Sequence, residues 1–419
     1  MCPAGNEVVD LRRHARADPD RPAVVCGDQR LSYGELEALA NRIAAVLRAR
    51  GLQRGDHIAS LVGNRPEGLA LAWAAWRTGV YLTPISTALV AAEVRYLVDD
   101  CDARAVIVDT DLAPLAIQVA CPAAMQRLAL RGQITGFVDL RPEIASASPA
   151  PADHEPPGAL MMYTSGTTGA PKGVHRPLLP ADWGGTPPFA ADLIELFGVG
   201  GTDVRYLSTA PLYHAAPLRV ALAVTAGGGT VFVMERFDAD EVLDLLEREA
   251  ITHSQWVPAM FQRLLALPAE RRARHKAPAH RTAIHGAAPC PVPVKRAMID
   301  WWGPILLEYY SGSEGVGLTL ITSEEALQRP GSVGRARKGV LHIVDESSHE
   351  LPTGTTGQVY FSGIAPFAYY KAPEKTAART SPQGWQTFGD IGHVDADGYL
   401  HLTDRLDDMI ISGGVNLYP

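Results

Sequence analysis

The sequence predicts an α/β protein made of two mostly parallel α/β subdomains and a smaller β-barrel. Up to about residue 330, strand-like apolar runs alternate with amphipathic helical runs, the pattern of βαβ units with parallel sheets. From Gly331 onward, short alternating runs are separated by turn residues, which favours antiparallel strands and a barrel over about residues 331–406. The chain has 419 residues, of which 47% are hydrophobic, and is too long for one compact domain.

The first subdomain is expected to open with a short hairpin at residues 21–30. Ser32 and Glu35 form a capping box before a helix with an apolar face, and Gly51 ends that helix. A strand at 57–62, a helix at 67–77 and a strand from Val80 then make a β-α-β unit, with Gly79 as the helix stop. A second alternation ends in a strand at 105–109.

The second subdomain follows a loop rich in Ala, Ser and Pro at residues 145–157. We expect strands at 206–210, 230–234, 251–253 and 305–309, and helices at 217–226, 239–249, 258–265 and 292–302. In the barrel region, strands are expected at 339–345 and 357–362, with a hairpin that turns at Asp397 and Gly398.

Composition excludes several classes of function. A net charge of -8 gives no electrostatic footprint for nucleic acid, and the basic cluster at 271–276 is expected to be a solvated loop. No signal peptide or membrane span is evident. A reducing cytoplasm suits five widely spaced cysteines, which are Cys2, Cys26, Cys101, Cys121 and Cys290.

A glycine- and hydroxyl-rich segment follows an apolar strand within residues 161–174. Glycines let backbone amides approach an anion closely, while hydroxyl groups and an ammonium add donors. The segment therefore predicts a phosphate-binding loop made by Thr164, Ser165, Gly166, Thr167, Thr168, Gly169 and Lys172. It is not a Walker loop, because Pro171 precedes the lysine and disfavours a helix there.

This segment resembles the phosphate loop of the adenylate-forming superfamily, which includes acyl-CoA synthetases, peptide-synthetase adenylation domains and luciferases. Further motifs follow in that family's order along essentially the whole chain. The resemblance implies an AMP-forming acid–thiol ligase, closest to the acyl-CoA synthetases. It also implies ATP and coenzyme A as co-substrates and Mg²⁺ as cofactor.

The resemblance also assigns an adenine pocket. The segment 285–289 resembles the turn that lines this pocket, and the segment 308–314 resembles the block whose tyrosine stacks on adenine. Tyr310 would be that tyrosine, and Glu308 would accept a hydrogen bond from the adenine amino group. The adenine-binding residues implied are Gly286, Ala287, Ala288, Glu308, Tyr309 and Tyr310.

Metal and ribose contacts are assigned in the same way. By the resemblance, Glu314 and Thr164 would hold Mg²⁺ together with the nucleotide phosphates, with Ser313 beside them. Asp390 would accept from both ribose hydroxyls, and Arg405 would reach ribose or phosphate. Phe388, two positions before Asp390, departs from the family's threonine.

The substrate argument depends on two neighbouring residues. His214 would lie where the acyl pocket meets the phosphates. The next position is Asp in amino-acid adenylation domains and Asn in aryl-acid domains that feed siderophore synthesis, whereas here it is Ala215. A pocket without that carboxylate leaves a substrate ammonium unpaired at high cost, so we expect a fatty, aryl or other non-amino acid.

The end of the chain resembles the family's hinge block, with Asp407 as the pivot. Residues 1–406 would then be the large ATP- and acyl-binding domain. Residues 407–419 would be the hinge and the stub of a small C-terminal domain that we expect to be missing from this sequence. Two alternatives remain open: a ligase that loads a carrier protein, and a nucleotide-binding fragment with little turnover.

Overall fold

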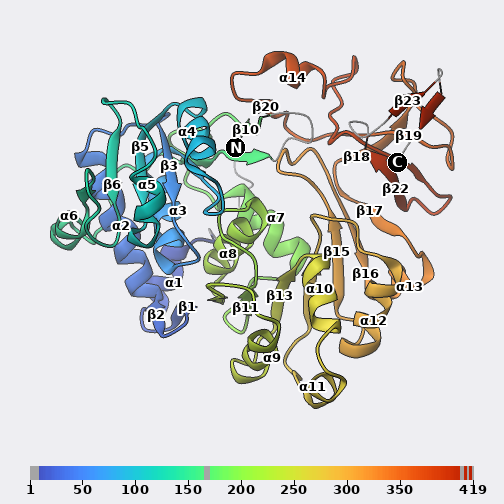
Figure 1. Ribbon diagram of the computed structural model, residues 1–419, viewed down its shortest axis with the longest axis horizontal. Helices are drawn as coiled ribbons and strands as arrows, with labels where there is room; N and C mark the ends of the chain where they lie inside the picture. The colour runs from blue at the N-terminus through green and yellow to red at the C-terminus, as the bar shows by residue number, and fades with distance from the viewer. Residues whose placement is uncertain (1–8, 165–169, 406–409, 413–414, 418–419) are drawn as a thin grey trace. The chain divides into compact units, whose positions relative to one another are not determined.

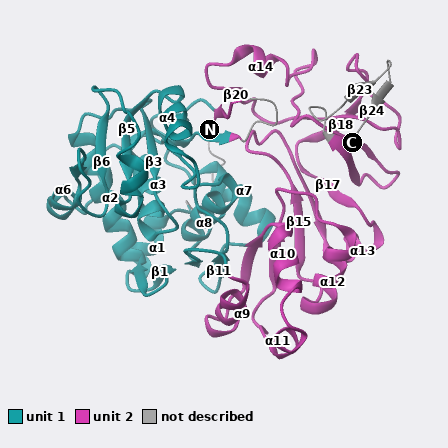
Figure 2. Ribbon diagram, in the orientation of Figure 1, with its two compact units in different colours: residues 1–163, 176–237 teal, residues 164–175, 238–419 magenta. Residues whose placement is uncertain are grey.

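The computed structural model describes residues 9–164, 170–405, 410–412 and 415–417. The chain forms two compact units (Figure 2). Unit 1 comprises residues 1–163 and 176–237, and unit 2 comprises residues 164–175 and 238–419. The segment that carries Lys172 therefore belongs to unit 2, although stretches of unit 1 flank it in the sequence.

Unit 1 contains a six-stranded sheet in the order β7-β6-β5-β3-β4-β8 (Figure 1). All neighbouring strands in it run parallel, as the sequence predicts for βαβ units. The strands are β3 (His57–Leu61), β4 (Tyr81–Pro84), β5 (Ala103–Val108), β6 (Gln126–Ala129), β7 (Val138–Asp139) and β8 (Ala159–Leu160). Every residue of β3 is buried, which is typical of a parallel strand covered on both faces.

The first helices of unit 1 confirm the local predictions. Helix α2 (Tyr33–Ala49) begins with the expected capping box, in which Ser32 and Glu35 each bond the other's backbone. Helix α3 (Pro66–Thr78) starts one residue before the predicted 67, because proline suits the first helical position. It stops at Gly79, whose φ of 74° is left-handed and favours glycine.

A further group of strands in unit 1 has the order β11-β12-β1-β2. The expected hairpin is formed by β1 (Pro22–Cys26) and β2 (Gln29–Ser32), and β1 continues parallel to β12 (Thr230–Val233), which pairs with β11 (Arg205–Ser208). Helix α8 (Ala215–Gly227) begins two residues before the predicted 217. The remaining elements of unit 1 are α1 (Leu11–Ala17), α4 (Ala91–Asp100), η1 (Thr110–Leu112), α5 (Ala113–Ala116), α6 (Arg141–Ser146) and α7 (Pro188–Phe197); β9 (Met162–Thr164) spans the boundary with unit 2.

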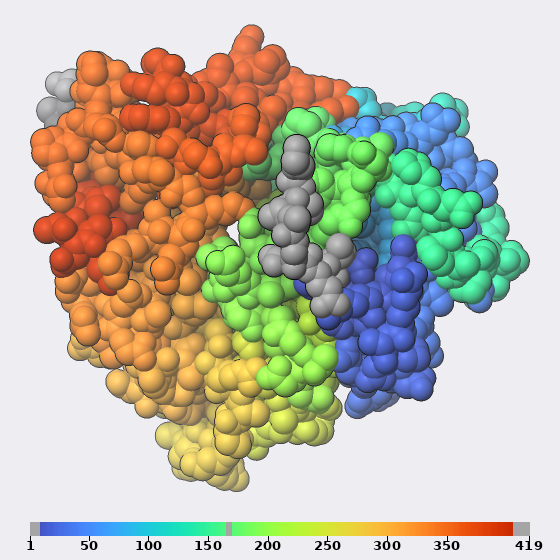
Figure 3. Space-filling model, turned by 180° about the vertical axis from the view of Figure 1, so that it is seen from behind, coloured from blue at the N-terminus to red at the C-terminus, as the bar shows by residue number. Residues whose placement is uncertain are grey.

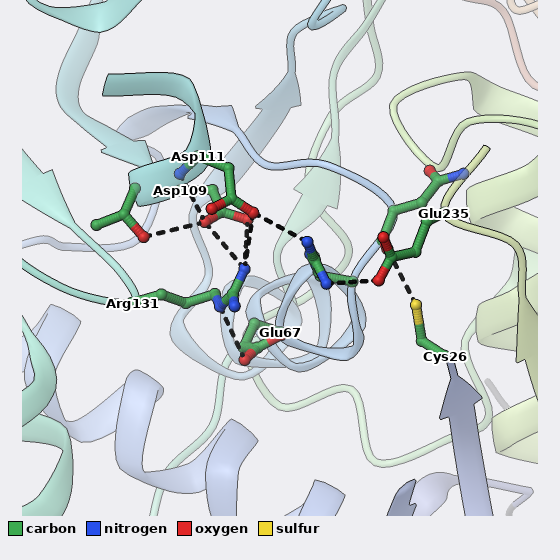
Figure 4. Close-up of polar contacts among 9 residues, drawn as sticks. Cys26, Glu67, Asp109, Asp111, Arg131 and Glu235 are labelled. Atoms are coloured by element: carbon green, nitrogen blue, oxygen red, sulfur yellow. Dashed lines mark hydrogen bonds and ion pairs between the residues drawn. The ribbon is translucent and has the colours of Figure 1, made fainter. Parts of the chain in front are cut away.

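A network of ion pairs lies at the carboxyl ends of β5 and β6 in the six-stranded sheet (Figure 4). Arg131, just after β6, contacts Asp109 at 3.2 Å and Asp111 at 3.3 Å, and it lies 3.6 Å from Glu67 on α3. Arg65 contacts the same Asp111 at 2.9 Å. Parallel sheets often bind ligands at this edge. Here the charged side chains are paired with one another, so we infer that the network stabilises the fold.

Unit 2 is built on a sheet with the order β18-β19-β21-β22-β17-β16-β15-β14-β13. The strands β13 (His253–Trp256), β14 (Thr282–His285) and β15 (Leu306–Tyr310) are parallel. The others pair antiparallel: β16 (Leu318–Thr322), β17 (Ser332–Lys338), β18 (Val340–Val344), β19 (Gly357–Ser362), β21 (Asp390–Val394) and β22 (Leu400–Arg405).

The separate β-barrel expected over 331–406 is not confirmed. The antiparallel strands of that region are present, and the predicted hairpin joins β21 to β22. Through β17 and β16, however, they continue the sheet that contains the parallel strands. A short antiparallel pair in the same unit is formed by β10 (Lys172–His175) and β20 (Ala368–Tyr369), and β23 (Ile410–Ser412) pairs with β24 (Val415–Leu417).

Helices complete unit 2. They are α9 (Ala239–Arg248), α10 (Pro258–Leu265), α11 (Ala269–Arg274), α12 (Val292–Trp302), α13 (Ser323–Gln328) and α14 (Pro373–Ala377). The basic cluster expected as a loop is largely the helix α11, in the yellow segment at the lower edge of Figure 3. Its Arg271 pairs with Asp240 and Asp244 of α9. Across the described part of the chain, no helix combines the length and apolarity that crossing a bilayer requires.

Candidate active site

Unit 2 contains most residues that the sequence assigns to nucleotide and metal binding. Those described there are Thr164, Lys172, Gly286, Ala287, Ala288, Glu308, Tyr309, Tyr310, Ser313, Glu314 and Asp390. His214 belongs to unit 1. Outside the described residues lie Ser165, Gly166, Thr167, Thr168, Gly169 and Asp407, and Arg405 is described only as the last residue of β22.

Lys172 and Glu314 contact the same tyrosine. Lys172 is the first residue of β10, and its Nζ lies 5.2 Å from the centre of the Tyr369 ring. The hydroxyl of Tyr369 donates to Oε1 of Glu314 at 2.7 Å. Both Tyr369 and Glu314 are buried. The lysine expected at the phosphates and the carboxylate expected at the metal are therefore brought together by a residue that the sequence did not single out.

The protonation of Tyr369 keeps this arrangement intact. Burial and the neighbouring Glu314 carboxylate raise the pKa of the Tyr369 phenol above its ordinary value, although the Arg379 guanidinium acts in the opposite direction. The phenol therefore remains a hydrogen-bond donor at neutral pH. A carboxylate oriented by an outer donor is a hard oxygen ligand of the kind Mg²⁺ prefers, so the residues present fit this cation.

Tyr310 and Asp390 are joined by a hydrogen bond across 80 residues of sequence. The Tyr310 hydroxyl donates to Oδ2 of Asp390 at 2.5 Å. The Phe388 ring stands edge-on to Tyr310, with ring centres 5.4 Å apart. Asp390 is buried at the start of β21, and it pairs in register with Arg405 of β22. The residues expected at adenine and ribose thus lie together.

Glu308 has a partner that the sequence did not reveal. Lys295 of α12 forms an ion pair with Oε2 of Glu308, and both side chains are buried. Burial raises the pKa of Glu308 even though the Lys295 ammonium lowers it. The contact of Glu308 with the adenine amino group stays a prediction, and the structure adds a constraint on it, since one carboxylate oxygen is already paired.

The segment expected to line the adenine pocket begins directly after β14. A Cβ on Gly286 would lie 2.6 Å from the Tyr309 carbonyl oxygen, so only glycine fits there. Ala287 follows with a left-handed φ of 68°. The preceding His285 is fully buried, and neither of its ring nitrogens has a hydrogen-bond partner among the described residues. Burial, with a contribution from Lys295, lowers the pKa of His285 to about 3.

In unit 1, His214 occupies the N-cap of α8, and Ala215 is the first residue of that helix. The Tyr213 ring centre lies 4.6 Å from that of His214. Although the His214 side chain is exposed, desolvation by the surrounding protein lowers its pKa, so its imidazole is neutral at neutral pH. A neutral imidazole adds no positive charge at the N-terminus of α8. The positive end of the helix dipole can therefore attract an anionic group there.

Sequence reasoning missed Tyr369 and Lys295. Tyr369 is one of two adjacent tyrosines before Lys371, and neither carries a signal that points to the Glu314 carboxylate. Lys295 stands on an amphipathic helix, where a lysine is ordinarily solvated. Only the fold, which places Lys295 of α12 beside Glu308 of β15, reveals the ion pair.

The chain is similar to known proteins over nearly its whole length. A family model described as AMP-binding enzyme matches residues 11–371. The long-chain-fatty-acid–CoA ligase FadD13 of Mycobacterium tuberculosis is 34% identical, over 98% of this chain and 80% of the relative. A feruloyl-CoA synthase of an Amycolatopsis species is 32% identical, over 97% of this chain and 80% of the relative.

A solved structure supports the same relationship. The Mycobacterium tuberculosis fatty acyl CoA synthetase aligns with a TM-score of 0.83 and 30% sequence identity. The alignment covers 98% of this chain and 80% of that one. The agreement extends over both units and is therefore not confined to one motif.

Proposed function

This chain belongs to the AMP-binding enzyme family, and we propose that it converts a fatty, aryl or other non-amino carboxylic acid to its coenzyme A thioester. The reaction is that of an AMP-forming acid–thiol ligase. The named relatives act on a long-chain fatty acid and on a feruloyl group, both of which are acids without an ammonium. Ala215 agrees with this class, because it offers no charge to pair with an amino group.

One observation of geometry carries the proposal: Lys172 and Glu314 share contacts with Tyr369, while Tyr310 and Asp390 are bonded to each other. In the first half-reaction, a carboxylate oxygen attacks the α-phosphorus of ATP. The bond to pyrophosphate breaks, and acyl-AMP forms. Lys172 offsets charge on the phosphates, and Asp390 with Tyr310 holds the nucleoside. Mg²⁺, held by Glu314 with Thr164, would neutralise phosphate charge in this site.

In the second half-reaction, the coenzyme A sulfur attacks the acyl carbonyl carbon, and AMP leaves with the electrons of the broken C–O bond. No protein nucleophile takes part. The cysteines that the structure describes agree, because burial raises the pKa of Cys26 to about 11 and those of Cys101 and Cys290 to about 12, and it also raises the pKa of Cys121. Such thiols are inert at neutral pH.

The proposal has consequences for organisation and location. We assign the large ATP- and acyl-binding domain to residues 1–406 and the hinge to Asp407 and the residues after it. A reducing cytoplasm suits a reaction that consumes a free thiol, and it also suits the widely spaced cysteines.

The test is pyrophosphate release by the full-length gene product with ATP, Mg²⁺ and a panel of fatty, aryl and branched acids. Each acid is assayed with coenzyme A, with a carrier protein and with neither acceptor. We expect acid-dependent pyrophosphate release, with thioester formed on coenzyme A. Thioester on the carrier protein alone would assign the acceptor differently, and no pyrophosphate with any acid would refute the proposed activity.

A further inference from the structure

Tyr369 touches both charged groups that the proposed function assigns to the phosphates and Mg²⁺. We propose that Tyr369 is a positioning residue of this site: its hydroxyl fixes the Glu314 carboxylate, and its ring face fixes the Lys172 ammonium. The inference rests on the proposed function of the same site. It adds a residue that acts through others without itself contacting the substrate.

The Tyr369 hydroxyl determines the orientation of the Glu314 carboxylate. Its Oε1 accepts from Tyr369 at 2.7 Å, and a Cβ on Gly312 would lie 2.9 Å from its Oε2. The phenol therefore holds Oε1, and Oε2 lies close to Gly312, where any side chain would crowd it. Fixing a carboxylate in this way prepares it for a cation, and loss of such an outer partner typically lowers metal affinity about 10- to 100-fold.

The face of the Tyr369 ring restrains the Lys172 ammonium. A lysine ammonium sits on a flexible stem of four carbons, and the face of an aromatic ring attracts it within about 6 Å. The Nζ of Lys172 is 5.2 Å from the Tyr369 ring centre. The ring contact therefore limits where the ammonium moves, and it ties the lysine to the carboxylate through one side chain.

The backbone around Tyr369 is held firmly enough for this role. Val174 of β10 pairs in register with Tyr369, which couples the tyrosine to the strand that begins with Lys172. The Tyr369 amide donates to the Thr376 hydroxyl at 2.9 Å, and its ring packs edge-on against Phe367 with centres 5.0 Å apart. A supporting residue locked by packing and hydrogen bonds holds its partners more precisely than one on a free loop.

The decisive variant is Tyr369→Phe, which removes the hydroxyl and keeps the ring. The readout is binding of the non-hydrolysable analogue α,β-methylene-ATP by calorimetry over a Mg²⁺ titration. We expect the half-saturating Mg²⁺ concentration to rise about tenfold or more, while affinity without Mg²⁺ changes less than about twofold. Tyr369→Leu should weaken binding without Mg²⁺ as well, because the ring face beside Lys172 is also lost.

The matched control is Tyr370→Phe, the same chemical change at the next residue. A double-mutant cycle gives a second control. If Tyr369 acts through Glu314, then adding Tyr369→Phe to Glu314→Gln should change the Mg²⁺ dependence by less than about twofold. Thermal unfolding of each variant shows whether packing against Phe367 survives.

Wild-type Mg²⁺ dependence in a folded Tyr369→Phe variant would overturn the inference, as would a full tenfold effect of this change in the Glu314→Gln background. Failure of the proposed function is separately visible. In that case the full-length wild-type protein would release no pyrophosphate with any acid, whatever the Mg²⁺ titrations of analogue binding show.

Discussion

Among single residues, Asp390 shows how the fold prepares a polar side chain for a ligand. It is buried, and Tyr310 already donates to its Oδ2. A buried carboxylate with an aromatic donor on one oxygen has a fixed orientation. This agrees with the proposed contact to the ribose hydroxyls.

Asp390→Ala should raise the dissociation constant for AMP at least about tenfold, because hydrogen bonds to a charged acceptor are worth about 1.5 to 3 kcal/mol each. Calorimetry with AMP measures the change. Tyr310→Phe, which leaves the carboxylate in place, should have a smaller effect. As the control, Asp397→Ala removes an exposed carboxylate from the same hairpin. Unchanged AMP affinity in Asp390→Ala would remove this residue from the site.

Ala215→Asp should lower kcat/KM for the best acid at least about tenfold without creating activity on amino acids, since an unpaired carboxylate in an apolar pocket is costly. Because Ala215 is the first residue of α8, an aspartate there also suits the helix dipole, so folding should survive. Ala216→Asp places the same charge one residue further along. Full activity of Ala215→Asp would show that this side chain does not face the acyl group.

At the level of elements, the carboxyl ends of parallel strands in the two units carry different polar groups. The carboxyl end of the unit 1 sheet uses ion pairs around Arg131 (Figure 4). In unit 2, β14 ends at His285, a buried neutral histidine whose ring nitrogens have no hydrogen-bond partner among the described residues. The two arrangements respond differently to mutation and to pH.

Arg131→Met should destabilise the protein by about 3 to 5 kcal/mol, because it leaves Asp109 charged and buried without its partner. The Asp109 side chain is only 1% exposed. Urea unfolding gives the free energy, and Arg104→Met is the control. Arg104 is 53% exposed in its pair with Asp56, and its loss should cost less than about 1 kcal/mol. Equal losses in the two variants would contradict the structural role of the network.

Acid should destabilise the protein through His280 and His285. Burial lowers the pKa of each to about 3, from 6.5 in the unfolded chain. Between these values the unfolded state binds more protons, so stability is full above pH 6.5 and falls with pH by up to about 1.4 kcal/mol per pH unit for each histidine.

His285→Phe should therefore lose less stability than wild type between pH 6.5 and pH 5. Urea unfolding at several pH values measures the slope. His349→Phe is the control, because His349 is 78% exposed. A wild-type slope in His285→Phe would mean that this histidine does not stay neutral in the folded protein.

For the whole molecule, the nucleotide motifs are not spread evenly. Unit 2 contains Lys172, the residues after β14, the segment 308–314 and Asp390, whereas unit 1 contains His214. A ligand that binds the folded state stabilises it by about 2.7 kcal/mol at one hundred times its dissociation constant. The stabilisation by a bound nucleotide should therefore be larger in unit 2 than in unit 1.

Hydrogen exchange with and without saturating AMP tests this expectation. Protection should increase in peptides that cover residues 172–175, 285–290, 306–314 and 388–394. Peptides from β5 and β6 of unit 1 serve as the internal control and should change little. Protection limited to unit 1 would contradict the assignment of the nucleotide site.

The sequence by itself determined the features that depend on neighbouring residues. The capping box of α2, the hairpin of β1 and β2, and the bounds of α12 at residues 292–302 follow from short patterns, because backbone conformation responds to residues a few positions away. The α/β class and the resemblance on which the AMP-binding assignment depends were readable for the same reason. Weaker patterns were missed, among them α7, β16 and α13.

Only the tertiary structure decided which of these residues meet. Tyr310 bonds Asp390 over 80 positions, Tyr369 bonds Glu314 over 55, and Lys295 pairs with Glu308 between a helix and a strand. It also joined the expected barrel strands to the sheet of unit 2 through β17. Such contacts are fixed by strand order, register and helix packing, which depend on the burial of the whole core and leave no mark in any short stretch of sequence.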